Sequence, residues 1–255
     1  MLKIILVGCN GFTGKAVSAI VADEPDVSIV AGVDLDTTEL CGFPVYKNVS
    51  EFGGEADVVL DFSSPAALEC LIAFSLDKRL PLILCATGYS PEQLAAIEKA
   101  AKRIPLFRSG NMSIGINLLS DLVRRACSVL AEGFDVEIVE RHHRRKLDAP
   151  SGTAMMLADA ASDALPYNPE YVFERRGSRQ PRAKHEIGIS AVRGGTIVGE
   201  HDVIFAGQHE LIELKHTAFS REVFAIGAVK AAKFMTGIGK PGMYDMSDVL
   251  AQVVV

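Results

Sequence analysis

The sequence predicts an α/β fold with two parts: a parallel sheet flanked by helices, and an α+β part with an open mixed sheet. In the first half, short apolar runs alternate with helical patterns, as in parallel sheets that are covered on both faces. A glycine-rich turn follows the first run directly. Beyond about residue 113, apolar and polar residues alternate, which favours strands with one solvent-facing side.

The first part is predicted to alternate strands with helices. Its strands are expected at Leu2–Val7, Val27–Val33, Val58–Asp61, Leu82–Cys85 and Pro105–Arg108. One helix is expected over Gly14–Ala22, and a second should begin at Pro65 with Ser64 as a candidate N-cap. Ser90-Pro91-Glu92-Gln93 has the pattern of a capping box, so a third helix should begin there.

The second part is predicted to combine helices with a sheet. Helices are expected over Gly115–Leu130 and from about Ser151, and a strand over Phe134–Val139. Two or three more strands should lie between residues 185 and 217, with a hairpin turn at Gly194-Gly195 between two of them. Residues 165–184 are the most loop-like.

The C-terminal segment returns to helix at Arg221–Phe234 and near Ser247–Val253. We therefore expect residues 1–113 and 219–255 to form one domain and residues 114–218 to form the other. The hinges should lie near Ser113 and Phe219.

Composition excludes several classes of protein. With 49% apolar and 23% charged residues, the 255-residue chain is typical of a soluble globular protein. No run approaches the ~18 apolar residues of a membrane span, and the net charge of −6 argues against general nucleic-acid binding. The five cysteines (Cys9, Cys41, Cys70, Cys85 and Cys127) are scattered and form no CxxC pair. We therefore expect reduced thiols and a cytoplasmic protein.

The turn Gly8-Cys9-Asn10-Gly11-Phe12-Thr13-Gly14 joins the first strand to the first helix with G-x-x-G-x-x-G spacing. This is a variant of the dinucleotide fingerprint, in which glycines let the pyrophosphate approach and the helix N-terminus attracts its charge. Asp34 ends the second strand, where its carboxylate can accept hydrogen bonds from a ribose. Three glycines alone could make a plain turn, but together with Asp34 they predict a Rossmann-like domain that binds a nicotinamide dinucleotide.

The acidic residue also bears on which dinucleotide is bound. Asp34 repels a 2′-phosphate, and Leu35 rather than an arginine follows it, so we expect NADH to be favoured. Lys15 could reach a phosphate, which leaves use of both NADH and NADPH open. Cys9 could be activated by the helix N-terminus, but an inert residue in the turn is the preferred interpretation, because low-pKa thiols need specific partners.

Residues 137–154 run from a strand through a basic loop to the start of a helix. Ser151 is a natural N-cap, which would leave the amides of Gly152 and Thr153 pointing to solvent, where a carboxylate binds well. Three neighbours can carry positive charge or donate protons: His142, His143 and Lys146. The segment therefore predicts a site for a small dianionic substrate with proton delivery.

Other interpretations of this segment stay open. A basic run is usually a solvated face, and it could also bind phosphate or nucleic acid, although it holds no aromatic residue and the chain is acidic. Zinc binding by His142 and His143 is disfavoured, because neighbours on a strand point to opposite faces. We predict no metal site.

The same segment resembles the most distinctive motif of the dihydrodipicolinate reductase family, E-x-x-E-x-H-H-x-x-K-x-D-x-P-S-G-T-A. The matching positions are Glu137, Glu140, His142, His143, Lys146, Asp148, Pro150, Ser151, Gly152, Thr153 and Ala154. Shorter matches extend over nearly the whole chain: the glycine turn, Asp61-Phe62-Ser63, Ala86-Thr87-Gly88-Tyr89, residues 111–117, Arg193-Gly194-Gly195, Gly199-Glu200-His201 and residues 243–246.

The resemblance implies NAD(P)H-dependent reduction of a (hydroxy)tetrahydrodipicolinate, a small dicarboxylate heterocycle, in diaminopimelate and lysine biosynthesis. It implies that His142 and Lys146 handle the proton, that His143 contacts the substrate, and that the turn at Ser151 presents the Gly152 and Thr153 amides to a carboxylate. The implied cofactor contacts are Gly8, Cys9, Asn10, Gly11, Phe12, Thr13, Asp34, Cys85, Ala86, Thr87, Ser109, Gly110, Asn111 and Met112. Cys85-Ala86 stands where the family commonly has Gly-Thr, so any side-chain contact from those two positions is lost.

The resemblance also implies a homotetramer formed through the open sheet, with cofactor and substrate meeting in the cleft between the two domains. Two alternatives stay open. One is another two-domain NAD-dependent dehydrogenase of aspartate-derived metabolism. The other is a non-catalytic NAD-binding sensor, which would have no reason to keep His142 and Lys146 beside a helix N-terminus.

Overall fold

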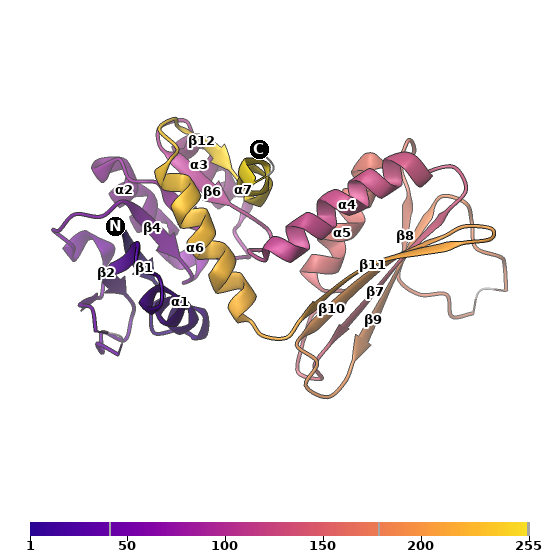
Figure 1. Cartoon of the computed structure of the whole chain (residues 1–255), viewed down its shortest axis with the longest axis horizontal. Coiled ribbons are helices and arrows are strands. Elements are labelled where there is room, and N and C mark those ends of the chain that lie inside the picture. Colours follow the sequence, from indigo (N-terminus) through magenta and orange to yellow (C-terminus); the bar gives the residue numbers. More distant parts are fainter. Residues whose placement is uncertain (41, 178, 254–255) are drawn as a thin grey trace. The chain divides into compact units, whose positions relative to one another are not determined.

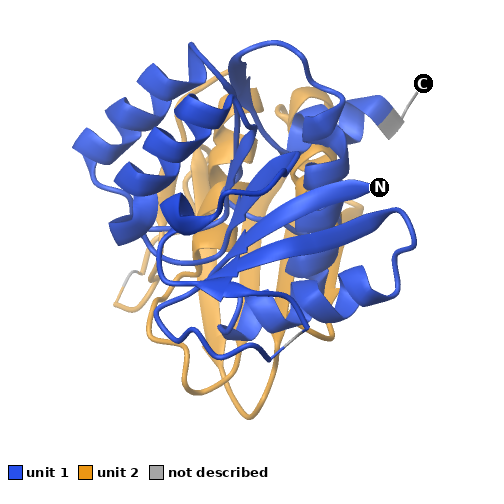
Figure 2. Cartoon of the chain, turned by 90° about the vertical axis from the view of Figure 1, so that its left-hand side faces the viewer, with its two compact units in different colours: residues 1–114, 222–255 blue, residues 115–221 orange. Residues whose placement is uncertain are grey.

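The computed structural model describes residues 1–40, 42–177 and 179–253, with side chains up to residue 252, so Cys41 lies outside the described residues. The chain divides into two compact units (Figure 2): unit 1 comprises residues 1–114 and 222–255, and unit 2 comprises residues 115–221. In the described part of the chain, no helix is long and apolar enough to cross a membrane.

Unit 1 is built on a parallel sheet of seven strands in the order β12-β6-β5-β4-β1-β2-β3 (Figure 1). The strands are β1 (Leu2–Val7), β2 (Val27–Val33), β3 (Val45–Tyr46), β4 (Val58–Asp61), β5 (Leu82–Leu84), β6 (Pro105–Arg108) and β12 (Gly242–Tyr244). The central strands β4 and β5 are buried along their whole length, as continuous apolar runs predict. The short β3 and β12 are not among the predicted strands, because two or three residues give no measurable periodicity.

Helices cover both faces of this sheet. They are α1 (Phe12–Ala22), α2 (Leu68–Lys78), α3 (Pro91–Ala101), α6 (Glu222–Thr236) and α7 (Met246–Val253), with 3-10 turns η1 (Val49–Glu51) and η2 (Pro65–Ala67). Ile4 and Leu6 of β1 pack in the core under α1 and α6, whereas Ile5 and Val7 pack in the core under α2 and α3. Successive residues of one strand thus supply two separate cores.

The helix starts test the predicted caps. Ser90 caps α3 as predicted: its Oγ accepts from the Gln93 amide at 3.3 Å, and the Gln93 side chain accepts from the Ser90 amide at 3.0 Å. The predicted cap at Ser64 is wrong, since its side chain makes no capping hydrogen bond. The chain first makes the turn η2 there, and α2 begins only at Leu68.

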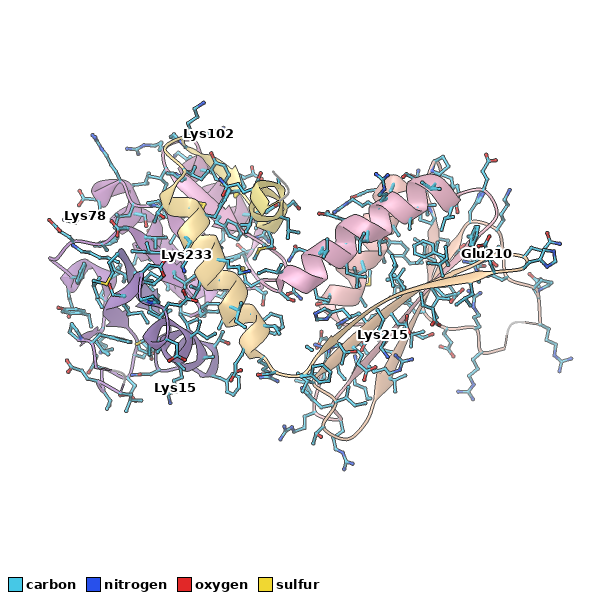
Figure 3. All side chains as sticks on the ribbon, in the orientation of Figure 1. Lys15, Lys78, Lys102, Glu210, Lys215 and Lys233 are labelled. Carbon is cyan, nitrogen blue, oxygen red and sulfur yellow. The ribbon has the colours of Figure 1, made fainter. Side chains whose placement is uncertain are left out.

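Ion pairs and close packing hold the C-terminal segment against the rest of unit 1. Lys233 on α6, labelled in Figure 3, lies 2.7 Å from Glu24 and 3.0 Å from Asp26, which follow α1. A Cβ on Gly227 of α6 would collide with the main chain of Met112, so this helix runs directly against the segment after β6.

Unit 2 packs two helices on one face of a mixed sheet with the order β11-β10-β7-β9-β8 (Figure 1). Its elements are α4 (Ile114–Leu130), β7 (Asp135–His142), α5 (Gly152–Ala164), β8 (Glu170–Val172), β9 (Glu186–Arg193), β10 (Gly199–Ala206) and β11 (Leu211–Ala218). The central strand β7 pairs parallel with β9 and antiparallel with β10. Its alternate residues, from Val136 to His142, are buried.

Gly194-Gly195 does not form the predicted hairpin turn. Because β7 lies between β9 and β10, the connection that holds these glycines crosses the end of β7. The Gly194 amide donates to the His142 carbonyl at 2.9 Å, and the Arg144 amide donates to the Gly195 carbonyl at 3.3 Å. The glycines therefore pack against the basic loop, which the dipeptide alone cannot reveal.

Two strand predictions in unit 2 also need correction. β7 continues to His142 instead of ending at Val139, since the polar residues after Val139 still alternate between the two faces of the sheet. Residues 170–172, inside the segment expected to be a loop, form the edge strand β8.

Candidate functional site

The residues predicted to bind the cofactor all follow parallel strands of unit 1. The glycine turn comes after β1 and Asp34 after β2, Cys85, Ala86 and Thr87 follow β5, and Ser109, Gly110, Asn111 and Met112 follow β6. The strands are neighbours or next neighbours in one parallel sheet, so their carboxyl ends lie along the same edge. This edge is where open α/β sheets bind ligands.

The glycine turn fits a dinucleotide because side chains are missing where the main chain comes close. Gly8 has a φ of +76°, and a Cβ on it would lie 2.8 Å from the Phe62 backbone. A Cβ on Gly14 would collide with the Gly8 carbonyl. Helix α1 begins at Phe12 and has no side-chain cap. The turn therefore presents main chain and a helix N-terminus, the groups that bind pyrophosphate.

A cavity of about 490 Å³ lies beside this turn, lined among others by Gly8, Gly11, Asp34, Leu35 and Lys47. The Asn10 amide donates to the Asp34 carboxylate at 3.0 Å, which joins the glycine turn to the loop after β2. A larger cavity, of about 810 Å³, lies by α3 and β12 and contains none of the predicted cofactor residues. The smaller cavity is therefore the candidate nucleotide site.

Several predicted cofactor contacts can come only from the main chain. Cys9 is fully buried and Met112 is 4% exposed, with both side chains in the core. The Cys9 sulfur lies close under Gly32, which fits an inert residue rather than an activated thiol. Burial, and secondarily the Asp61 carboxylate, raise the pKa of the Cys85 thiol well above its usual value, so this side chain stays neutral.

In unit 2, a buried carboxylate joins the end of β7 to the start of α5. Glu140 is fully buried, and one of its oxygens lies 2.6 Å from His142 Nδ1. The other oxygen accepts from the Ser151 amide at 3.0 Å. Arg193 of β9 donates to both oxygens, at 2.6 and 2.7 Å. Burial alone would raise the pKa of Glu140, but the hydrogen bonds from Arg193, His142 and Ser151 hold it below its usual value.

Lys146 lies next to the start of α5. Its ammonium is 2.9 Å from the Asp148 carboxylate, and the nearby Gly152 amide is the smallest of the influences that lower the pKa of Asp148. Arg193 Nη2 donates to the Asp148 carbonyl at 2.6 Å, so the same arginine holds this loop and Glu140. The amide that was predicted to face solvent at Gly152 thus lies near a carboxylate of the chain itself. Thr153 also interacts with another part of the chain.

The Ser151 side chain makes its contacts within the fold itself. Its Oγ accepts from the Ala154 amide at 3.1 Å, as predicted for an N-cap, and lies 2.9 Å from His201 Nε2. The residue is 2% exposed. These contacts are those of a helix cap, and the substrate contact of Ser151 stays a prediction.

The two histidines of the basic loop have different surroundings. His142 is buried on the inner face of β7, whereas His143 begins the loop and its Nε2 lies 3.4 Å from Arg221. Burial, and then the charges of Arg221 and Arg145, lower the pKa of His143. Arg141, one residue before His142 on β7, instead lies 3.5 Å from Glu200 on β10.

His201 was not assigned a role from the sequence, yet it belongs to this cluster. It lies opposite Glu140 across the β7–β10 pair, and its ring is edge-on to that of His142 with centroids 5.1 Å apart. Burial, followed by the charge of His142, lowers its pKa to about 3, so it is neutral at physiological pH. Within the described ranges, no three His, Cys, Asp or Glu residues are placed to hold a metal ion.

Known proteins resemble the chain along its whole length. The family described as "Dihydrodipicolinate reductase, N-terminus" matches residues 2–112, and "Dihydrodipicolinate reductase, C-terminus" matches residues 115–250. The 4-hydroxy-tetrahydrodipicolinate reductase of Clostridium tetani is 53% identical over 98% of this chain and 97% of its own. That of Caldanaerobacter subterraneus is 52% identical over 98% of both chains.

The solved structures show the same fold. A dipicolinate-bound dihydrodipicolinate reductase from Paenisporosarcina sp. TG-14 superposes with a TM-score of 0.81 over 96% of this chain and 97% of that one, at 24% identity. The GenD2 protein of gentamicin A biosynthesis, solved in complex with NAD, superposes with a TM-score of 0.61 at 15% identity. At these sequence identities the superpositions show a shared fold and nothing more.

Proposed function

Because the chain belongs to the dihydrodipicolinate reductase family, we propose that its reaction is carried by His142 and Lys146, with the start of α5 as the seat of a substrate carboxylate. The activity is that of a 4-hydroxy-tetrahydrodipicolinate reductase, an NAD(P)H-dependent oxidoreductase of diaminopimelate and lysine biosynthesis. The alternatives of another aspartate-derived dehydrogenase and of a non-catalytic sensor are set aside.

One observation carries the assignment of the substrate site. The Asp148 carboxylate pairs with the Lys146 ammonium just before the start of α5, and the Gly152 amide helps to lower the pKa of Asp148. A carboxylate is therefore favoured at this position, which combines a cation with a helix N-terminus. A substrate carboxylate would replace that of Asp148 there. Arg221 supplies a second cation, next to the His143 ring, suited to the other carboxylate of a dianionic ring.

Lys146 is the proposed donor of the proton that the substrate ring needs after hydride transfer. When bound, the reduced nicotinamide supplies a hydride to the conjugated ring, and a neighbouring ring carbon then needs a proton. The Lys146 side chain is 22% exposed and carries three donor hydrogens, so it can deliver a proton and regain one from water. His142 is the second group that can exchange a proton with the substrate, and Glu140 holds the ring at its Nδ1 nitrogen.

We propose NADH as the preferred cofactor, with NADPH also used. Asp34 lines the cavity by the glycine turn, and its carboxylate would repel a 2′-phosphate. Leu35 beside it supplies no positive charge, but Lys47 lines the same cavity and can partly compensate a phosphate. The contacts proposed for Ser109, Gly110 and Asn111 belong to the nicotinamide end of the same cofactor.

We also propose a homotetramer in the cytoplasm. The face of the unit 2 sheet away from its helices carries half-buried apolar residues such as Val139 and Ile204, and Val192 is 44% exposed. A second copy of the sheet would cover them. None of the described cysteines, Cys9, Cys70, Cys85 and Cys127, forms a disulfide, which suits a reducing compartment. Light scattering of the purified chain would test the oligomer: a monomer at micromolar concentration contradicts it.

The assignment is tested by a coupled assay in which dihydrodipicolinate synthase supplies the substrate and the purified chain consumes NADH or NADPH. We expect turnover with both and a higher kcat/KM with NADH. If the His142→Gln and Lys146→Ala variants turn over the substrate as fast as the unchanged protein, the roles proposed for these two residues are contradicted. The meeting of cofactor and substrate in an interdomain cleft, with hinges near Ser113 and Phe219, stays a prediction.

A further inference from the structure

The buried carboxylate of Glu140 faces two kinds of donor. Its Oε1 accepts from Arg193 Nη2 at 2.6 Å and from the Ser151 amide at 3.0 Å, and neither donor can become an acceptor. Its Oε2 accepts from Arg193 Nη1 at 2.7 Å and lies 2.6 Å from His142 Nδ1. Among these partners only the imidazole can either donate or accept.

This contact decides which nitrogen of His142 is free to exchange a proton. An ionised carboxylate only accepts hydrogen bonds, so Nδ1 of His142 has to keep its hydrogen whether the ring is neutral or charged. The exchanging nitrogen is then Nε2. A Cβ on Gly199 would lie 3.1 Å from Nε2, so this nitrogen faces the start of β10, where a glycine leaves room.

The same carboxylate also fixes the start of α5. It accepts a hydrogen bond from the amide of Ser151, the residue whose Oγ caps the helix directly before Gly152. The bidentate contact from Arg193 prevents the Glu140 side chain from rotating away from either partner.

We propose that Glu140 is a positioning residue for the reaction: it holds His142 with Nδ1 protonated and Nε2 open, and it aligns that ring with the anion-binding start of α5. The inference rests on the role proposed for His142, but not on that of Lys146. In this proposal Glu140 connects His142 with the start of α5, and itself contacts neither substrate nor cofactor.

Side-chain ¹⁵N NMR of the histidines tests the protonation pattern directly. The chain has six histidines, and comparison with His142→Gln assigns the signals of His142. In the unchanged protein we expect a proton on Nδ1 at neutral pH and above. A neutral His142 ring with its proton on Nε2 overturns the proposal, even if no Glu140 variant folds.

Glu140→Gln provides the second test. We expect the glutamine oxygen at the position of Oε1, which faces two fixed donors, because the position of Oε2 faces only one, Arg193 Nη1. The NH₂ group then gives up the contact with Nη1 and faces His142, so Nδ1 has to accept. We expect the tautomer of His142 to reverse and kcat to fall by about 10- to 100-fold, with the Kd of NADH changed by less than about twofold. A Glu140→Gln enzyme with a reversed tautomer and an unchanged kcat overturns the proposal.

Glu137→Gln is the matched control. Glu137 lies on the same strand and also pairs with arginines, 2.8 Å from Arg175 and 3.0 Å from Arg182, but it does not contact His142. We expect this variant to keep the tautomer and to keep kcat within about twofold. If His142→Gln retains full kcat, the role of His142 fails and Glu140 falls with it. If His142→Gln loses kcat but Glu140→Gln does not, only the role of Glu140 fails.

Discussion

The Asp148 carboxylate lies 2.9 Å from the Lys146 ammonium just before the start of α5, so the loop places its own anion at the proposed position of a substrate carboxylate. The hydrogen bond from Lys146 is the main reason why the pKa of Asp148 is lowered. The Asp148 side chain is 56% exposed, and exposed ion pairs contribute only roughly 0.2–1 kcal/mol. A dicarboxylate can therefore displace it at small cost.

Asp148→Asn should tighten the binding of dipicolinate. The substitution removes a competing carboxylate and a negative charge from the site, and the ion-pair energy corresponds to a fall in Kd of about two- to fivefold. Isothermal titration with dipicolinate would measure it. Asp121→Asn is the matched control, because Asp121 forms an equally short and exposed pair with Arg124 on α4. Weaker binding by Asp148→Asn would show that Asp148 supports the site instead of competing for it.

Lys146→Ala should reduce kcat far more than NADH affinity. Lys146 is assigned to the proton and lies in unit 2, whereas the glycine turn and Asp34 lie in unit 1. We expect kcat to fall by about 100-fold or more, while the Kd of NADH, followed by fluorescence titration, stays within about twofold. Lys146→Arg should restore substrate affinity but not kcat, because a guanidinium keeps its proton. Equal losses in kcat and in NADH binding would refute the assignment.

The parts of the fold that the sequence predicts are those with local signals. β1, β2 and β4 are uninterrupted apolar runs between turns, and the structure has them at the predicted bounds. The connection at Gly194-Gly195 differs from the predicted hairpin because a glycine pair specifies a turn but not its partner strand. The strand that separates β9 from β10 is β7, which lies some fifty residues earlier in the chain.

The candidate site divides in the same way. His142, Lys146 and Ser151 are close in sequence, so one motif names them together. The link from Glu140 to Arg193 spans 53 residues, and no local pattern specifies it. A usable signal exists, however: Glu140 occupies an inward position of an alternating strand, and a buried acid requires cationic or amide partners.

Leu35→Arg should shift cofactor use toward NADPH. Leu35 is 87% exposed and lines the cavity beside Asp34, so an arginine there can pair with a 2′-phosphate. We expect kcat/KM for NADPH to rise by about tenfold, equivalent to about 1.4 kcal/mol, and the gain to shrink at high salt. Leu118→Arg adds the same charge in unit 2 and should leave the NADPH to NADH ratio unchanged. A ratio unaffected by Leu35→Arg would place the 2′-phosphate elsewhere.

The buried His201 should make the protein less stable in acid. Its pKa is lowered from 6.5 to about 3, chiefly by burial, so the unfolded chain binds a proton that the folded chain rejects between these values. The stabilising contribution is therefore fully present above about pH 6.5 and is lost as the pH falls toward 3. A single group of this kind contributes at most about 1.4 kcal/mol per pH unit to the free energy of unfolding.

Urea unfolding at pH 7.5 and pH 5 measures this slope, and His201→Gln should flatten it, since glutamine does not titrate while its amide can still bind Ser151 Oγ. We expect the variant to be less stable than the unchanged protein at pH 7.5 and to approach it at pH 5. His209→Gln, at an exposed position in the β10–β11 turn, is the control and should keep the original slope. If His201→Gln leaves the slope unchanged, folding does not lower the pKa of His201, and the ring then takes up a proton beside His142 in the folded protein at pH 5.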